Sequence, residues 1–332
     1  MTTSLTAIID GYLELRWQLD PVAATAAGAH EHDQRWPDRS QAAVRTLAAA
    51  LRSYAGSLEE AEADSLQDEI DRTAALHAAR HDIDQLERWR PFARDPGWHL
   101  RHLLDGLYVL LLTLPHDPVR RTEAIVARLR GAPEFLQTAV EALTAVAPVH
   151  IETARSMLPG AIDLVRQGIP DAPLDMSVLE PGVLDEAIGA CVDGLLEFSE
   201  WLETASESAD GDFALGLALY DNMLHTAHML RDGADALARY GGQLRRDSEE
   251  ELSALAGEIE PGTSWRELAD RLDAEGAPED TLGFLKAEIE SAREFVERND
   301  LLTLAVRPLV IEQTPPYLVP LVPLAAYVPA GA

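Results

Sequence analysis

The sequence has little cysteine and little lysine. Cys191 is the one cysteine among 332 residues, which excludes an internal disulfide and is typical of a reducing compartment. It lies in an apolar stretch with no histidine nearby, so we expect a buried structural thiol rather than a nucleophile. Lys286 is the single lysine, and we interpret this shortage as a compositional bias.

Positive charge is scarce as a whole. The chain has 57 acidic and 27 basic residues, a net charge of −30. A surface of this sign repels phosphate backbones and anionic lipid headgroups, so we expect neither nucleic acid nor a membrane as partner. The acidic residues are spread along the chain rather than gathered in a tail, which is typical of a solvated coat.

Long apolar runs and an export signal are also missing. The longest apolar run, residues 107–112, is far shorter than the roughly 20 residues that cross a membrane. The first ten residues contain no basic residue and end in Asp10, unlike a signal peptide. We therefore expect a cytoplasmic protein.

Aromatic residues make up only 6% of the chain, and β-branched residues are sparse before the last thirty positions. The core must therefore be built mainly from Leu, Ala and Val, and apolar residues recur with helical spacing. We predict an all-α, multi-helix array. One long helix is expected from about residue 59 to Trp89. Later, Gly241-Gly242 should end a helix and Asp247-Ser248 should cap the next.

Proline and glycine suggest the domain boundaries. We predict a helical subdomain over 1–158, a Pro- and Gly-rich connection over 159–181, a second helical subdomain over 182–300 and an extended apolar tail over 301–332. The prolines of the tail exclude helix, while Leu309-Val310-Ile311 could form a short edge strand. Such an apolar tail must be covered by another surface.

Common catalytic motifs are absent: the chain has no His-Glu-x-x-His, Gly-x-Ser-x-Gly, phosphate-binding glycine loop or Cys-x-x-Cys. Its ten histidines nevertheless suggest a metal site. His77 and His81 lie four residues apart on one helical face, and Asp84 could add a third zinc ligand from the next turn. The alternative interpretation is a partly solvated helix face.

Two further histidine pairs have helical spacing. His99 with His102, and His225 with His228, could converge across a helical core and line a cavity. The alternative is that they are interior side chains bonded to nearby backbone. His30-Glu31-His32-Asp33 is dense in ligand atoms but forms a polar turn, in which successive side chains point in different directions. This turn could equally cap helices.

Short motifs in the chain resemble those of a bacterial family. They occur in the same order over the whole chain: Asp10-Gly11-Tyr12, Pro21-Val22-Ala23-Ala24-Thr25, Gly28-Ala29-His30-Glu31-His32-Asp33, Pro37-Asp38-Arg39-Ser40, Ala132-Pro133-Glu134-Phe135-Leu136, Ala214-Leu215-Gly216-Leu217-Ala218-Leu219-Tyr220-Asp221, Pro315-Pro316-Tyr317-Leu318 and Ala326-Tyr327-Val328-Pro329. By these motifs the chain resembles the N-terminal helical part of the family called domain of unknown function 885 (DUF885).

The resemblance implies a metallopeptidase-like protein. Members of the family resemble helical zinc peptidases, with a His-Glu-x-x-Pro-Gly-His-His motif after the Tyr- and Pro-rich segment. That motif does not occur in this sequence, so no zinc ligand and no water-activating glutamate can be assigned. The resemblance places Tyr317 and Tyr327 nearest to such a motif. It implies zinc only where a C-terminal catalytic half is present.

Three functional hypotheses follow, and whether the chain is an enzyme stays open. The leading one is the helical wall of a substrate channel in a zinc-metallopeptidase-like protein, inactive as a peptidase in this form. The second is a stand-alone helical protein whose cavity binds a small or peptide-like ligand, or transforms it without metal. The third is a partner subunit of a separately encoded catalytic chain. A homodimer or a C-terminal catalytic half would cover residues 301–332.

Overall fold

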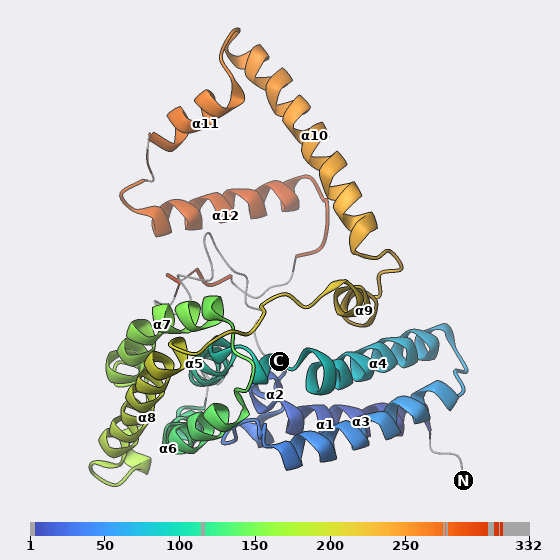
Figure 1. Ribbon diagram of the computed structural model, residues 1–332. Helices are drawn as coiled ribbons and strands as arrows, with labels where there is room; N and C mark the ends of the chain where they lie inside the picture. The colour runs from blue at the N-terminus through green and yellow to red at the C-terminus, as the bar shows by residue number, and fades with distance from the viewer. Residues whose placement is uncertain are drawn as a thin grey trace. The chain divides into compact units, whose positions relative to one another are not determined.

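Helices make up the regular secondary structure of this protein (Figure 1). The computed structural model describes residues 4–113, 117–274, 276, 278–304, 309–311 and 313–314. These residues form twelve α-helices and no strand. None of these helices is both long and apolar enough to cross a membrane. The predicted all-α fold is confirmed.

The chain divides into two compact units at Gly233 and Ala234. The first unit contains nine of the described α-helices: α1 (Leu5–Leu19), α2 (Pro21–Ala26), α3 (Gln41–Glu60), α4 (Leu66–Asp84), α5 (Pro96–Thr113), α6 (Pro118–Ala142), α7 (Pro148–Asp163), α8 (Val183–Ser206) and α9 (Leu217–His228). Five short helical turns connect them: η1 (His30–His32), η2 (Gln85–Trp89), η3 (Pro91–Ala93), η4 (Leu164–Gly168) and η5 (Met176–Val178).

Polar side chains fix where the first helices begin. Ser4 accepts a hydrogen bond from the Ala7 amide and so caps α1. Asp20 in the same way accepts from the Ala23 amide and caps α2, and Ser40 caps α3. Each cap satisfies an amide that the helix itself leaves unpaired.

The core of the first unit has two apolar clusters. In the larger one, α5, α6, α7 and α8 pack together around fully buried leucines such as Leu103, Leu107 and Leu195. Gly194 of α8 allows the closest approach, since a Cβ there would lie 3.1 Å from the Cα of Pro133 on α6. In the smaller cluster, α1, α3 and α4 run alongside one another (Figure 1).

A buried arginine joins three helices of this unit. The Arg128 guanidinium on α6 donates to the Gly106 carbonyl on α5 and, at 2.8 Å, to the Thr25 hydroxyl on α2. It also lies over the Trp36 ring, whose indole N–H donates to the Arg128 carbonyl. Burial lowers the pKa of Arg128 to about 10, so the group is still charged at neutral pH. Hydrogen bonds to several acceptors offset its desolvation.

Residues 159–181, expected as a connection, lie inside the first unit. Helix α7 continues through Pro159 and is followed by the π-helical turn η4. Val165 and Ile169 are fully buried in the larger cluster, so this segment contributes to the core. Proline costs a helix one hydrogen bond, and burial of the neighbouring apolar side chains offsets that loss.

The second unit, residues 234–314, contains α10 (Ala234–Ile259), α11 (Trp265–Ala274) and α12 (Thr281–Arg298). Among its described residues only Ala256 is buried. Helix α10 runs without interruption through Gly241-Gly242 and Asp247-Ser248, so the helix end and cap expected there were wrong.

The extended tail is described only in part. The edge strand expected at Leu309-Val310-Ile311 was wrong, because these residues form no strand. A strand needs a second strand for its hydrogen-bond ladder, and the described part of the chain offers none. Residues 315–332, including Tyr317 and Tyr327, lie outside the described residues.

Candidate functional site

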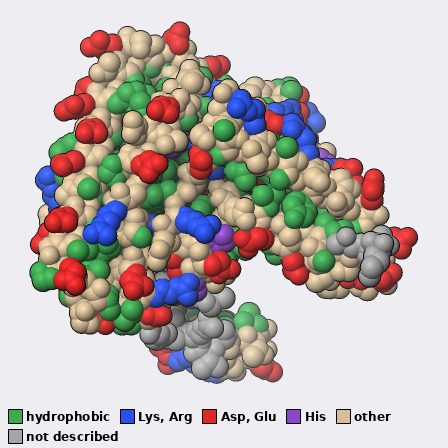
Figure 2. Space-filling model, turned by 90° about the horizontal axis from the view of Figure 1, so that it is seen from below, with side chains coloured by type: hydrophobic (Ala, Val, Ile, Leu, Met, Phe, Trp, Pro, Cys, Tyr) green, Lys and Arg blue, Asp and Glu red, His purple; other side chains and the backbone are tan. Residues whose placement is uncertain are grey.

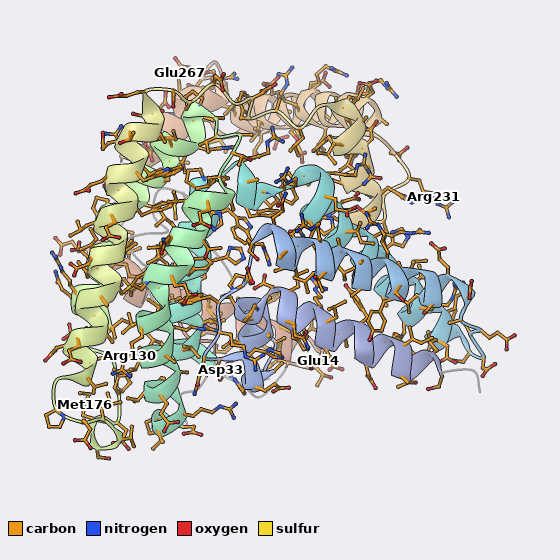
Figure 3. The ribbon with its side chains drawn as sticks, turned by 60° about the horizontal axis from the view of Figure 1, so that its bottom comes forward. Glu14, Asp33, Arg130, Met176, Arg231 and Glu267 are labelled. Atoms are coloured by element: carbon orange, nitrogen blue, oxygen red, sulfur yellow. The ribbon has the colours of Figure 1, made fainter. Side chains whose placement is uncertain are left out.

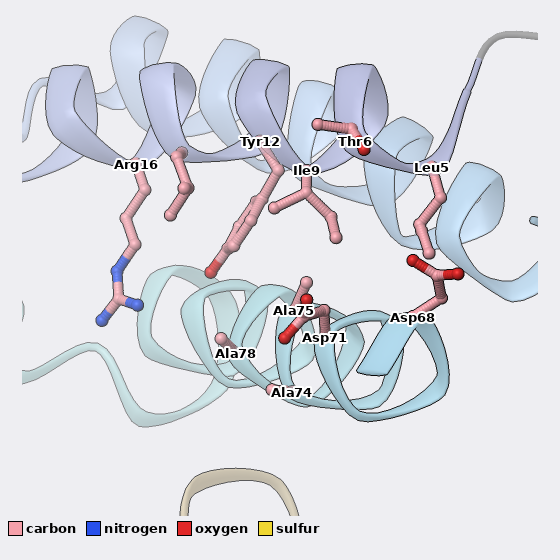
Figure 4. A pocket seen from close by; sticks show the side chains of 11 residues that line it. Leu5, Thr6, Ile9, Tyr12, Arg16, Asp68, Asp71, Ala74, Ala75 and Ala78 are labelled. Carbon is pink, nitrogen blue, oxygen red and sulfur yellow. The ribbon is translucent and has the colours of Figure 1, made fainter. Parts of the chain in front are cut away.

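A groove lies between α1 and α4 in the first unit (Figure 4). It encloses about 360 Å³, which is within the range of small-ligand pockets. Three alanines of α4, Ala74, Ala75 and Ala78, form one wall. Their short side chains leave space beside the helix that larger residues would fill. The opposite wall comes from α1 and is mainly apolar; it is formed by Leu5, Thr6, Ile9, Tyr12 and Leu13.

The two ends of the groove carry opposite charges. Arg16 of α1 lies at one end, and Asp68 of α4 lies at the other, beside Leu5 (Figure 4). Asp71 lies between them on the same wall as Asp68. Apolar walls with a few placed charges are typical of a ligand site, in which the charges fix the orientation of the ligand.

A buried carboxylate lies next to Arg16 at the positively charged end of the groove. The Tyr12 hydroxyl donates to the Asp82 carboxylate at 2.8 Å, and the Arg16 Nε lies 3.8 Å from the same carboxylate. Asp82 is only 3% exposed, and this burial raises its pKa, although Arg16 and Tyr12 oppose the effect. Burial and the Asp82 charge raise the pKa of Tyr12. Tyr12 is therefore a neutral donor, and Asp82 holds the arginine at the groove end.

The first predicted histidine pair lies on α5 but does not line the groove. His99 is 1% exposed, and its Nε2 lies 2.7 Å from the Phe92 carbonyl oxygen. Burial lowers the pKa of His99 to about 3. His102 is partly buried, with Nε2 3.5 Å from the Asp20 carboxylate. Burial alone would raise the pKa of Asp20, but His102 and the Ala23 amide outweigh it and hold that pKa well below its usual range.

The other predicted histidines meet where α4 contacts α9. The His77 Nδ1 lies 3.1 Å from the His225 carbonyl oxygen, and the two rings are 5.1 Å apart. His225 and His228 are exposed, so they are surface rather than core residues. His81 is partly buried, and burial lowers its pKa.

Asp84, the third predicted zinc ligand, is engaged elsewhere. It accepts hydrogen bonds from Asn222 of α9 and from Arg88. Asp84 does not form, with His77 and His81, a group of ligand atoms close enough for one metal ion within the described residues. A role in ligand binding stays a prediction for all these histidines.

The comparison with protein families decides the classification. The model of the family described as "Bacterial protein of unknown function (DUF885)" matches residues 21–332. The chain belongs to this family. The predicted bacterial DUF885 membership is therefore confirmed, and the metallopeptidase-like character stays a prediction.

A solved structure shares the fold of this DUF885 chain. It is described as "a putative lipoprotein of unknown function" from Shewanella oneidensis, with a TM-score of 0.69 and 18% sequence identity. The match covers 94% of this chain and 61% of that one, so this chain spans less than two thirds of its relative's length. At this identity the likeness shows the fold alone. No curated protein matches the chain.

The DUF885 chain also gathers a group of ligands that the sequence did not predict. One ligand atom each from Glu14, Glu31 and His32 lies within 4.8 Å of the others. Glu14 comes from α1, whereas Glu31 and His32 lie in η1. The ligand-rich turn was visible in the sequence, but nothing in its spacing pointed to Glu14.

Proposed function

We propose that the α1–α4 groove binds a peptide-like ligand, and that the chain is the helical, substrate-binding part of a metallopeptidase-like DUF885 protein. The observation that carries the proposal is the apolar groove with Arg16 at one end and Asp68 and Asp71 toward the other. A peptide with free termini has the same pattern: a carboxylate at one end, an ammonium at the other and mixed side chains between.

The length of the groove suggests the length of the ligand. Leu5 and Arg16 are eleven positions apart on α1, which corresponds to about 16 Å along a helix axis. An extended chain advances about 3.3 Å per residue, so about five residues span this distance. We place the peptide carboxylate at Arg16 and the amino group near Asp68 and Asp71.

The experiment is a calorimetric titration with a pentapeptide that has free termini, and with the same peptide acetylated and amidated. Asp71→Asn should weaken binding of the free peptide up to about fivefold, because an exposed ion pair contributes up to about 1 kcal/mol. The blocked peptide should bind both proteins equally. Glu69→Gln, which removes an acid of α4 that does not line the groove, is the matched control and should change nothing.

Two results would contradict this assignment. One is the absence of saturable binding by the free peptide. The other is an equal loss for the free and blocked peptides in Asp71→Asn. The proposal also holds that these 332 residues do not hydrolyse peptides, since they lack the zinc motif. Chelator-sensitive cleavage by the chain would overturn that part.

Exposed apolar side chains in the second unit support the expectation of a polypeptide partner. On α10, Leu244, Leu252, Leu255 and Ile259 are each at least 41% exposed and recur at helical spacing. We extend the predicted homodimer or C-terminal catalytic half to this surface. Sedimentation velocity tests the homodimer. The wild-type chain should sediment as a dimer and Leu255→Glu as a monomer. A monomeric wild-type chain would contradict the homodimer and leave a C-terminal catalytic half as the proposed partner.

A further inference from the structure

His32 is a buried histidine with unsatisfied nitrogens. It is 2% exposed, and neither Nδ1 nor Nε2 has a hydrogen-bond partner among the described residues. A buried polar atom without a partner costs about 1–3 kcal/mol, so native proteins seldom leave both nitrogens of one ring in this state. The ring therefore indicates a ligand that the protein atoms do not supply.

The surroundings of His32 show the charge of that ligand. The His32 Nε2 lies 3.7 Å from Oε1 of Glu14, and the Glu31 carboxylate completes a group whose ligand atoms are all within 4.8 Å. A separation of 3.7 Å is too long for a hydrogen bond. The Nε2 atom therefore faces a carboxylate without bonding to it, and a cation between them could bind the imidazole nitrogen and the carboxylate oxygens together.

Local structure holds the three groups in place. His30 lies 3.1 Å from Asp33 and so helps to hold the turn η1, in which His32 faces Glu14 of α1. Gln18 donates to Oε1 of Glu14 at 3.1 Å and so steadies that carboxylate. Figure 3 labels Glu14 on α1 and Asp33 just after η1, in the same lower part of the view.

We propose that His32, Glu14 and Glu31 bind a divalent transition-metal ion, with zinc as the best-matched probe. Zinc takes histidine nitrogen and carboxylate oxygen at about 2.0–2.2 Å, which puts tetrahedral ligands about 3.4 Å apart. The three ligand atoms lie up to 4.8 Å apart, so they must move slightly closer together to bind one ion. The two exposed glutamates can make this movement by side-chain rotation. Solvent water fills the remaining position.

The ion would tie the turn η1 to α1. These elements are separated in sequence by α2, and the negative charge of the chain favours cation binding in general. The site is separate from the α1–α4 groove, which none of its three residues lines. The proposal of a metal site therefore does not depend on the proposal that the groove binds a peptide.

The test is equilibrium dialysis of the chelator-treated full chain with zinc, followed by thermal unfolding with and without the ion. We expect one saturable high-affinity zinc ion per chain. Glu14→Gln and Glu31→Gln should each weaken binding at least tenfold while the metal-free unfolding temperature stays unchanged, since both side chains are exposed. At one zinc concentration, the ion should raise the unfolding temperature of the wild type by more than that of these variants.

Asp10→Asn, which removes another exposed acid of α1, is the matched control and should bind zinc like the wild type. His32→Gln should abolish binding, and the two glutamate variants keep the test decisive if that core change prevents folding. X-ray absorption of the zinc-bound chain should show one imidazole and otherwise oxygen ligands. No saturable site, or equal affinity in Glu14→Gln and Asp10→Asn, would overturn the proposal.

Discussion

His99 should make the folded chain sensitive to mild acid. Its Nε2–H donates to the Phe92 carbonyl at 2.7 Å, and Nδ1 is buried without a partner among the described residues. A second proton would therefore lie on Nδ1 with no acceptor. Burial lowers the pKa of His99 from 6.5 to about 3.

The sign and size of the effect follow from proton linkage. Below pH 6.5 the unfolded chain protonates this histidine while the folded chain does not, so the free energy of unfolding falls as the pH decreases. The slope is about 1.4 kcal/mol per pH unit, which amounts to about 2 kcal/mol between about pH 7.5 and about pH 5. The loss should end near the folded-state pKa of about 3.

Urea unfolding across this pH range measures the effect. His99→Gln keeps an N–H donor for the Phe92 carbonyl but does not titrate, so the wild type should lose about 2 kcal/mol more than the variant. His228→Gln, which removes an exposed histidine of α9, should follow the wild type. Equal losses in His99→Gln and the wild type would refute the reasoning, because the folded chain would then accept the proton on His99 readily.

Three further outcomes are expected. Gly106→Ala should lower the free energy of unfolding by about 1–3 kcal/mol in urea, because its Cβ would overlap the Trp36 ring, and an unchanged midpoint would argue against this contact. Tyr12→Phe and Asp82→Asn should show a coupling of about 1–3 kcal/mol in a double-mutant cycle, whereas strict additivity would mean that their hydrogen bond contributes nothing. Burial raises the pKa of Cys191 to about 12, so this thiol should resist alkylation in the folded chain and react in urea. Mass spectrometry can measure the labelling, and rapid labelling of the folded chain would contradict the burial of Cys191.

The fold class was predictable because helical periodicity and composition are local signals. The ends of the helices were harder to predict from the sequence than the fold class. The long helix expected from about residue 59 to Trp89 begins later, at Leu66 with Ser65 as its cap, because residues 59–60 still belong to α3. The serine was visible in the sequence, but the acidic Glu59 and Glu60 also fit the first turn of a helix and placed its start too early. Conversely, α10 continues through two glycines, each costing a helix about 1 kcal/mol.

The distribution of acidic side chains can be followed on one face of the molecule. Acidic side chains are scattered over the visible face in Figure 2 rather than collected in one block. This arrangement agrees with the solvated coat that the sequence predicts.

The candidate sites depend on contacts between distant residues, which spacing cannot reveal. Tyr12 and Asp82 are seventy positions apart, and the groove exists only because α1 packs beside the alanine face of α4. Glu14 likewise meets His32 through the path of α2 and the turn after it. Sequence could mark the ligand-rich turn but could not identify the helix that faces it.

The most direct test of the central claim is a crystal structure of the chain with the free pentapeptide. The account predicts an extended peptide between α1 and α4, with its carboxylate beside Arg16 and its amino group beside Asp68 and Asp71. A peptide bound elsewhere, or bound in the groove in the opposite direction, would contradict the assignment of the charged ends.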